Sequence, residues 1–251
     1  MAVQGIIFDL GHTLMHLAGT WPQVFEQGAL DLAAFVDRQR LGLEGEAFAR
    51  ALLERRQEDY HQAQETGREV TAEASMRWTF ARFGLPQPDE SLLRGSIDAF
   101  FAFEETCWQA DSQALPVLGE LAGRGWRLGL FSNATDDLFI QRLVDRFAFR
   151  PWLEPVLSSA GTGMRKPDPV AFAPFLDAWG LEPGSVVVVG DTLEADILGA
   201  NCAGMHSVWL RSRPDARPEG GKDRGAGAQE RPRPDATIDR LAELLDRLAE
   251  L

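Results

Sequence analysis

Two short apolar runs that stop abruptly at an aspartate constrain the fold most strongly. Residues 6–8 are followed by Asp9, and residues 186–189, four consecutive valines, are followed by a glycine and Asp191. An apolar run of this length is typical of a strand buried in a parallel sheet. In open sheets of this kind, the residues just past the carboxyl ends of the strands line the ligand crevice. We therefore expect Asp9 at the floor of a site, although a simple polar turn is the alternative for Asp9 taken alone.

Strand and helix patterns alternate over the rest of the chain, without hairpin signals. We predict further strands at 126–131, 157–159 and 206–210, and helices at 115–122, 169–180 and before Gly204. This alternation predicts an α/β fold with a doubly wound, Rossmann-like parallel sheet. A last helix is predicted from apolar residues on one helical face: Ile238, Leu241, Leu244, Leu245 and Leu248.

The block 17–110 interrupts this alternation directly after the first strand. Its apolar residues recur at helical spacing, and Gly42, Gly67 and Gly84 divide it into about four helices. We therefore expect a core of 1–16 and 111–251 with a helical cap domain at 17–110. Residues 211–234 are rich in proline, glycine and charge, and we expect them to form a mobile loop.

Composition narrows the class of protein. The 251 residues carry a formal net charge of −13, which argues against binding to nucleic acid. No apolar run is long enough to span a membrane, and no signal peptide is recognisable. Cys107 and Cys202 match no metal-binding or redox spacing, which favours a reducing compartment. We expect a cytoplasmic protein.

Polar residues at the predicted strand ends form a chemically coherent set. Asp9 can act as a carboxylate nucleophile, and Ser132 with its neighbouring amides can hold phosphoryl oxygens. Lys166, one of two lysines in the chain, can neutralise charge on them. Asp191, together with Asp9 and near Asp196, can hold Mg²⁺, which takes carboxylates and phosphate oxygens as ligands. The set has the parts that phosphoryl transfer needs, although each residue alone can be a helix cap or a solvated loop residue.

These residues resemble the four motifs of the haloacid-dehalogenase (HAD) superfamily, over nearly the full chain. The motifs appear as residues 9–14 (DLGHTL), 131–133 (FSN), 165–168 (RKPD) and 190–196 (GDTLEAD). The helical insertion is similar to the small cap of one branch of this superfamily.

The resemblance implies a role for each motif residue. It implies Asp9 as nucleophile and Lys166 as charge stabiliser. Ser132 and Asn133 become phosphate ligands. The metal site would consist of Asp9, the Gly11 carbonyl, Asp191 and Asp196, the last directly or through water.

Gly11 departs from the superfamily pattern. Phosphatases that the chain resembles usually carry an aspartate there as general acid and base, whereas a glycine supplies only its backbone carbonyl. Gly11 and His12 are candidate phosphate-binding residues in this turn. His12 can also replace the missing acid, but adjacent residues in a turn generally point apart, so a structural role is the alternative.

Three functions are compatible with these motifs. The favoured one is an Mg²⁺-dependent phosphatase that forms an aspartyl-phosphate at Asp9 and acts on a small phosphorylated metabolite. The first alternative is a metal-independent 2-haloacid dehalogenase, a family with an aromatic hydroxyl at the position of Gly11; the chain's one tyrosine, Tyr60, lies in the insertion instead. The second is a catalytically impaired protein that binds phosphometabolites or a protein partner.

Overall fold

The computed structural model describes residues 3–211 and 232–248. The chain divides into two compact units: the sheet unit, Met1–Leu17 with Gln109–Leu251, and the helical unit, Ala18–Trp108. Most of the loop expected at 211–234 lies outside the described residues. No helix in the described part of the chain has the length and apolar character needed to cross a bilayer.

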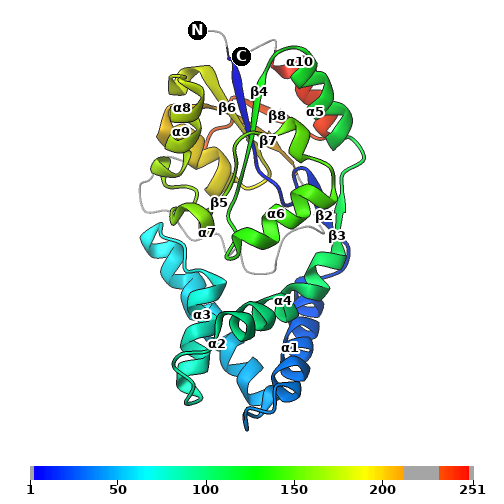
Figure 1. The fold of residues 1–251 in the computed structure, drawn as a ribbon. Coiled ribbons are helices and arrows are strands. Elements are labelled where there is room, and N and C mark those ends of the chain that lie inside the picture. The colour runs from blue at the N-terminus through cyan, green and yellow to red at the C-terminus, as the bar shows by residue number, and fades with distance from the viewer. Residues whose placement is uncertain (1–2, 212–231, 249–251) are drawn as a thin grey trace. The chain divides into compact units, whose positions relative to one another are not determined.

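A six-stranded sheet in the order β5-β4-β1-β6-β7-β8 organises the sheet unit (Figure 1). Every neighbouring pair of strands is parallel. The sequence therefore predicted the doubly wound α/β fold correctly. The strands are β1 (Gly5–Phe8), β4 (Arg127–Ser132), β5 (Val156–Ser158), β6 (Val186–Gly190), β7 (His206–Leu210) and β8 (Ala236–Ile238).

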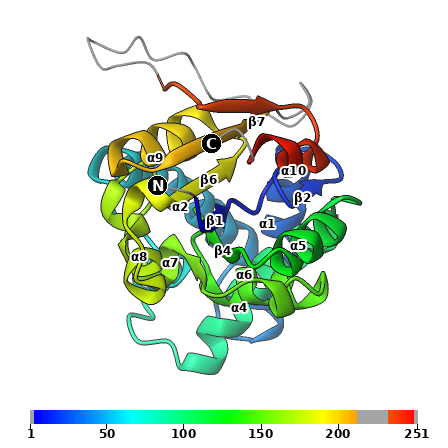
Figure 2. The same ribbon diagram turned by 90° about the horizontal axis from the view of Figure 1, so that it is seen from above.

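Helices cover both faces of this sheet (Figure 2). Helices α8 (Ala173–Trp179) and α9 (Leu198–Ala203) lie on one side, and α5 (Ala114–Gly123) and α10 (Leu244–Arg247) lie on the other. Phe175 of α8 approaches the sheet so closely that a Cβ at Gly129 would lie 2.6 Å from its ring. A cluster of buried apolar side chains packs between α8, α9 and the sheet, and it includes Ile7, Val186 and Val188 of the strands. The alternate residues of these strands are also buried, which explains the continuous apolar runs.

Helices α6 (Asp137–Arg146) and α7 (Ser159–Thr162) and several turns complete the sheet unit. Helix α6 begins at Asp136, whose carboxylate accepts the Phe139 N–H. Helix α7 follows β5 directly. The 3₁₀ turn Pro169–Phe172 is capped by Asp168, as the sequence predicted for the start of this helical segment.

The predicted last helix is wrong at its beginning. Ile238 lies in strand β8 and pairs with Leu210, and the helical segment starts only at Leu241. Ile238 is buried because it faces inward from an edge strand, and Leu241 and Leu244 are buried by the helix that follows. The buried apolar residues of the strand and of the next helix therefore have the same spacing in the sequence as residues on one face of a single helix.

The helical unit contains α1 (Trp21–Arg38), α2 (Gly45–Thr66), α3 (Ala72–Arg82) and α4 (Glu90–Cys107). Gly42, Gly67 and Gly84 all have positive φ, which explains why the chain turns between helices at these glycines. Helices α1 and α4 pack closely at Gly28, where a Cβ would lie 2.5 Å from the Phe100 carbonyl oxygen.

The two ends of the helical unit meet. The backbone N–H of Ala18 donates to the Cys107 carbonyl at 2.8 Å. Next to them, β2 (Met15–Leu17) and β3 (Trp108–Ala110) form a two-stranded sheet that the sequence analysis missed. The insertion therefore leaves the sheet unit and returns to it at neighbouring positions.

The carboxyl group of Glu104 lies buried in the interior of the helical unit. Glu104 of α4 accepts a hydrogen bond from the Trp108 indole N–H at 3.2 Å. Burial raises the pKa of Glu104 from 4.5 to about 7, although the Trp108 bond and the Arg56 charge act in the opposite direction. The protonated carboxyl is therefore favoured by folding, and ionisation near neutral pH opposes it.

Replacing this carboxyl with an amide should remove a pH dependence of stability. Because the pKa of Glu104 is higher in the folded than in the unfolded chain, the stability that its protonated form contributes is lost as pH rises toward 7 and above. As pH rises from 5 to 8, we expect the free energy of unfolding of Glu104→Gln to increase relative to that of wild type, by up to about 3 kcal/mol. Urea unfolding at several pH values measures this gain.

Glu105→Gln is the matched control, because the adjacent half-buried side chain undergoes the same chemical change. A difference between Glu104→Gln and wild type that is constant from pH 5 to 8 would contradict the prediction.

Candidate active site

The sheet unit brings the predicted polar residues together at the carboxyl ends of three adjacent strands. Asp9 follows β1, Ser132 ends β4, and Asp191 follows β6. Strands β4, β1 and β6 are neighbours in the sheet (Figure 1). The Asp9 N–H extends the strand pairing by donating to the Val189 carbonyl at 2.9 Å. The position of Asp9 is therefore set by the rigid sheet.

The Lys166 ammonium lies at the centre of this group. It donates to Asp9 Oδ1 at 2.7 Å, to Asp196 Oδ1 at 2.6 Å and to the Phe131 carbonyl at 2.9 Å. Lys166 is 3% exposed. Burial alone would lower its pKa, but the charges of Asp196 and Asp9 together raise the pKa above its ordinary value. Lys166 is therefore a permanent cation that orients two carboxylates.

Asn133 holds the main chain of Lys166 in place. Its side-chain amide donates to the Lys166 carbonyl and accepts the Lys166 N–H, both at 2.9 Å. This bidentate clamp, between residues 33 positions apart, gives Asn133 a positioning function that the sequence analysis missed. Its assignment as a phosphate ligand stays a prediction.

Both carboxylate oxygens of Asp196 accept hydrogen bonds. Oδ1 accepts from Lys166, and Oδ2 accepts the Thr192 N–H at 3.0 Å across the π-helical turn Leu193–Ile197. Asp196 is 1% exposed, and it lies so close to Gly190 that a Cβ there would be 2.2 Å from its carboxyl carbon. Gly190 is therefore required by the position of Asp196.

Asp9, Asp191 and Asp196 form a cluster that fits a metal ion. One carboxylate oxygen of each lies within 4.8 Å of the others. Burial, followed by the charges of Asp9 and Asp196, raises the pKa of Asp191 to about 8. Three carboxylates face a single ammonium, so a divalent cation would balance the cluster, and oxygen donors of this type suit Mg²⁺.

The turn after Asp9 contains the remaining candidates. Gly11 forms an isolated bridge with Met15, and its carbonyl as a metal ligand stays a prediction. His12 has φ 60°. Burial, and to a smaller extent the charge of His16, lower the pKa of His12. Thr13 was not singled out from the sequence, yet it is 2% exposed and its hydroxyl has no hydrogen-bond partner among the described residues.

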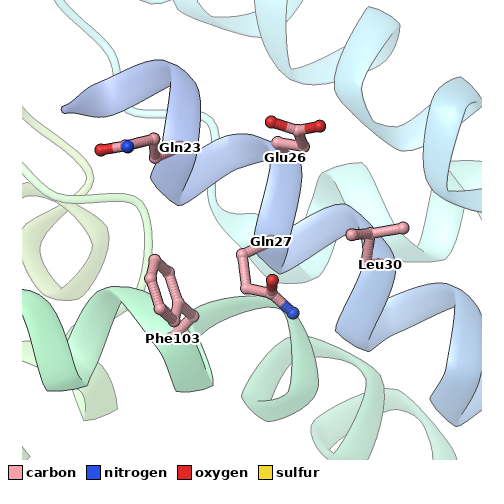
Figure 3. Close-up of a pocket in the computed structure, with 5 residues that line it drawn as sticks. All are labelled: Gln23, Glu26, Gln27, Leu30 and Phe103. Atoms are coloured by element: carbon pink, nitrogen blue, oxygen red, sulfur yellow. The ribbon is translucent and has the colours of Figure 1, made fainter. Parts of the chain in front are cut away.

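A surface pocket in the helical unit has a different character (Figure 3). It lies between α1 and α4 and is lined by Gln23, Glu26, Gln27, Leu30 and Phe103. The pocket contains one carboxylate, that of Glu26, among neutral side chains, and it lacks the paired charges found around Lys166. The strand ends of the sheet unit are therefore the better candidate for chemistry.

Comparison with known proteins identifies the class to which this α/β fold and its polar strand ends belong. A model of the haloacid dehalogenase-like hydrolase family matches residues 3–204. The chain belongs to this family and is a hydrolase.

Its relatives include named phosphatases. It is 30% identical to the ribulose-1,5-bisphosphate 5-phosphatase of Halopiger xanaduensis, over 96% of this chain and 97% of the relative. It is also 30% identical to the glyceraldehyde 3-phosphate phosphatase of Methanopyrus kandleri, over 65% of this chain and 67% of that protein.

A solved structure shares the fold across the chain. A 2-haloacid dehalogenase from Pseudomonas syringae pv. tomato DC3000 is 25% identical, with a TM-score of 0.69 and 99% of each chain covered.

The close approach at Gly190 generates a prediction. Gly190→Ala should push Asp196 away from Lys166 and destabilise the protein by about 1–3 kcal/mol through overpacking. Lys166 should also become reactive toward an amine-directed reagent, and mass spectrometry distinguishes it from Lys222, the other lysine. Gly184→Ala, where a Cβ has nothing within 4 Å, should leave both properties unchanged. Equal stability and equal labelling of the two variants would contradict this account.

Proposed function

We propose that this hydrolase is an Mg²⁺-dependent phosphatase of a small phosphorylated metabolite. The observation that supports this most directly is the pairing of Asp9 Oδ1 with the Lys166 ammonium at 2.7 Å beside two further carboxylates. The phosphatase activities named for the relatives from Halopiger and Methanopyrus support the same substrate class.

In the proposed reaction, an Asp9 carboxylate oxygen attacks phosphorus and the bond to the ester oxygen breaks. The leaving oxygen takes up a proton from solvent after it departs. Water then attacks the phosphorus of the aspartyl-phosphate and releases a proton to solvent, which gives phosphate and restores Asp9. Lys166 orients Asp9 and neutralises charge on the phosphoryl oxygens, which Ser132 and Asn133 also contact. Mg²⁺, held by Asp9, Asp191, the Gly11 carbonyl and, directly or through water, Asp196, would supply positive charge for the phosphoryl group. The helical unit is proposed to be the cap.

A 2-haloacid dehalogenase is the second candidate, favoured by the likeness to the Pseudomonas structure. In that reaction Asp9 would displace a halide from carbon, and no metal would be needed. The cluster of Asp9, Asp191 and Asp196 argues for the phosphatase, because a third carboxylate near the nucleophile opposes the binding of an anion unless a cation is present.

Metal dependence separates these two functions. Turnover of p-nitrophenyl phosphate should require Mg²⁺ and should fall by more than about 10³-fold in Asp9→Asn and in Asp191→Asn. Asp177→Asn, an exposed position on α8, serves as the control and should retain activity. Release of chloride from 2-chloropropionate in excess chelator, without phosphatase activity, would establish the dehalogenase instead.

Gly11 generates a second prediction about rate and substrate preference. A positioned general acid typically contributes about 10²–10⁴-fold, or roughly 3–5 kcal/mol of barrier. Without one, we expect slow turnover that strongly favours acidic leaving groups, such as aryl and acyl phosphates over alkyl phosphates. Gly11→Asp should accelerate alkyl phosphates more than aryl ones, and Gly11 is not among the glycines with positive φ, so its backbone permits a side chain.

A rate series across leaving-group pKa measures this effect. Gly11→Asn is the matched control, because it has nearly the same size and no carboxyl proton to donate. An equally shallow dependence on leaving-group pKa in wild type and Gly11→Asp would show that another group, such as His12, already supplies the proton.

A further inference from the structure

A tryptophan outside the four motifs contacts the site through its indole N–H. Trp209 lies in β7, where it is the register partner of Gly190 in β6. Its Nε1–H donates to the main-chain carbonyl of Asp191 at 2.9 Å. Residue 209 also lies beyond the segment 3–204 that matches the family, so the resemblance assigns no function to it.

Asp191 occupies a position that electrostatic repulsion opposes. Its carboxylate shares a 4.8 Å cluster with those of Asp9 and Asp196. Lys166 donates to Asp9 and to Asp196, while the hydrogen bond found for the Asp191 side chain comes from the adjacent Thr192 hydroxyl, at 3.1 Å. A bond from the neighbouring residue cannot anchor the loop to the sheet.

The Trp209 bond supplies such an anchor. Strand β7 pairs with β6 over four residues, and β7 is itself covered on its other edge by β8, so the indole projects from a fixed backbone. Its N–H fixes the peptide group between Asp191 and Thr192. The position of this peptide determines the position of the Asp191 Cα, from which the carboxylate extends into the cluster. Partners of this kind commonly change metal affinity by 10–100-fold.

We propose that Trp209 is a positioning residue that holds Asp191 in place for binding a divalent cation. The inference rests on the proposed function, because it takes Asp191 as a metal ligand. It adds that a residue on β7, the strand next to β6, increases the affinity of the site for a cation.

The test measures Mn²⁺ binding by the electron paramagnetic resonance of the free ion, without substrate. Trp209→Phe keeps an aromatic ring but loses the N–H, and it should weaken binding about tenfold. Trp209→His carries a ring nitrogen at the position equivalent to the indole Nε1 and should bind more tightly than Trp209→Phe. In activity assays, Trp209→Phe should need more Mg²⁺ for half-maximal rate, while kcat at saturating Mg²⁺ stays close to the wild-type value.

Trp179→Phe is the matched control. The Trp179 indole donates to the Glu154 carbonyl at 3.0 Å, so this variant loses an equivalent bond. Glu154 precedes β5, at the amino ends of the strands and therefore at the opposite edge of the sheet. We expect Trp179→Phe to bind Mn²⁺ within about twofold of wild type, which separates positioning from general destabilisation.

Asp191→Asn distinguishes the two levels of the proposal. If Asp191→Asn weakens Mn²⁺ binding but Trp209→Phe does not, or if Trp209→His binds no better than Trp209→Phe, the positioning function is overturned and the metal site stands. If Asp191→Asn leaves Mn²⁺ binding unchanged, the proposed metal site itself is overturned.

Discussion

The buried ammonium of Lys166 is the interaction on which the site depends. A charge buried this deeply is tolerated only when it is paired and hydrogen-bonded, and Lys166 meets both conditions. Its partners come from three places: Asp9 after β1, the Phe131 carbonyl in β4, and Asp196 after β6. One side chain therefore joins three strand ends, and Asn133 fixes the backbone from which that side chain extends.

The carboxylates of Asp9, Asp191 and Asp196 lie close together although they repel one another. Lys166 compensates part of the charge of three clustered carboxylates, and burial, followed by the charges of Asp9 and Asp196, raises the pKa of Asp191 to about 8. Backbone features keep the acids together in spite of this: the absence of a side chain at Gly190 and the Thr192 N–H locate Asp196. A divalent cation bound by these carboxylates, as proposed, would relieve the repulsion among them.

Local sequence patterns were sufficient for β1, β4, β5, β6 and β7 and for the residues at their ends, because a buried parallel strand leaves a continuous apolar run. They missed the three-residue strands β2 and β3, which are too short for such a run. They failed at Ile238, where a strand and a helix placed apolar residues at compatible intervals. They also missed the bonds from Asn133 and Trp209, since each joins a side chain to the main chain of a residue far away in sequence. Such contacts have no local signature and become visible only when the strands are ordered.

The meeting of Ala18 and Cys107 has a consequence for how the chain folds. Strand β1 must pair with β4, which lies on the far side of the whole helical insertion, and closing so long a loop slows folding. Once the insertion has folded, its joined ends take residues 18–107 out of that loop, and the cost of closure falls because it depends on the length of flexible chain. The order of folding is therefore expected to run from the inserted helices to the sheet, although the first strand of the sheet precedes those helices in the sequence.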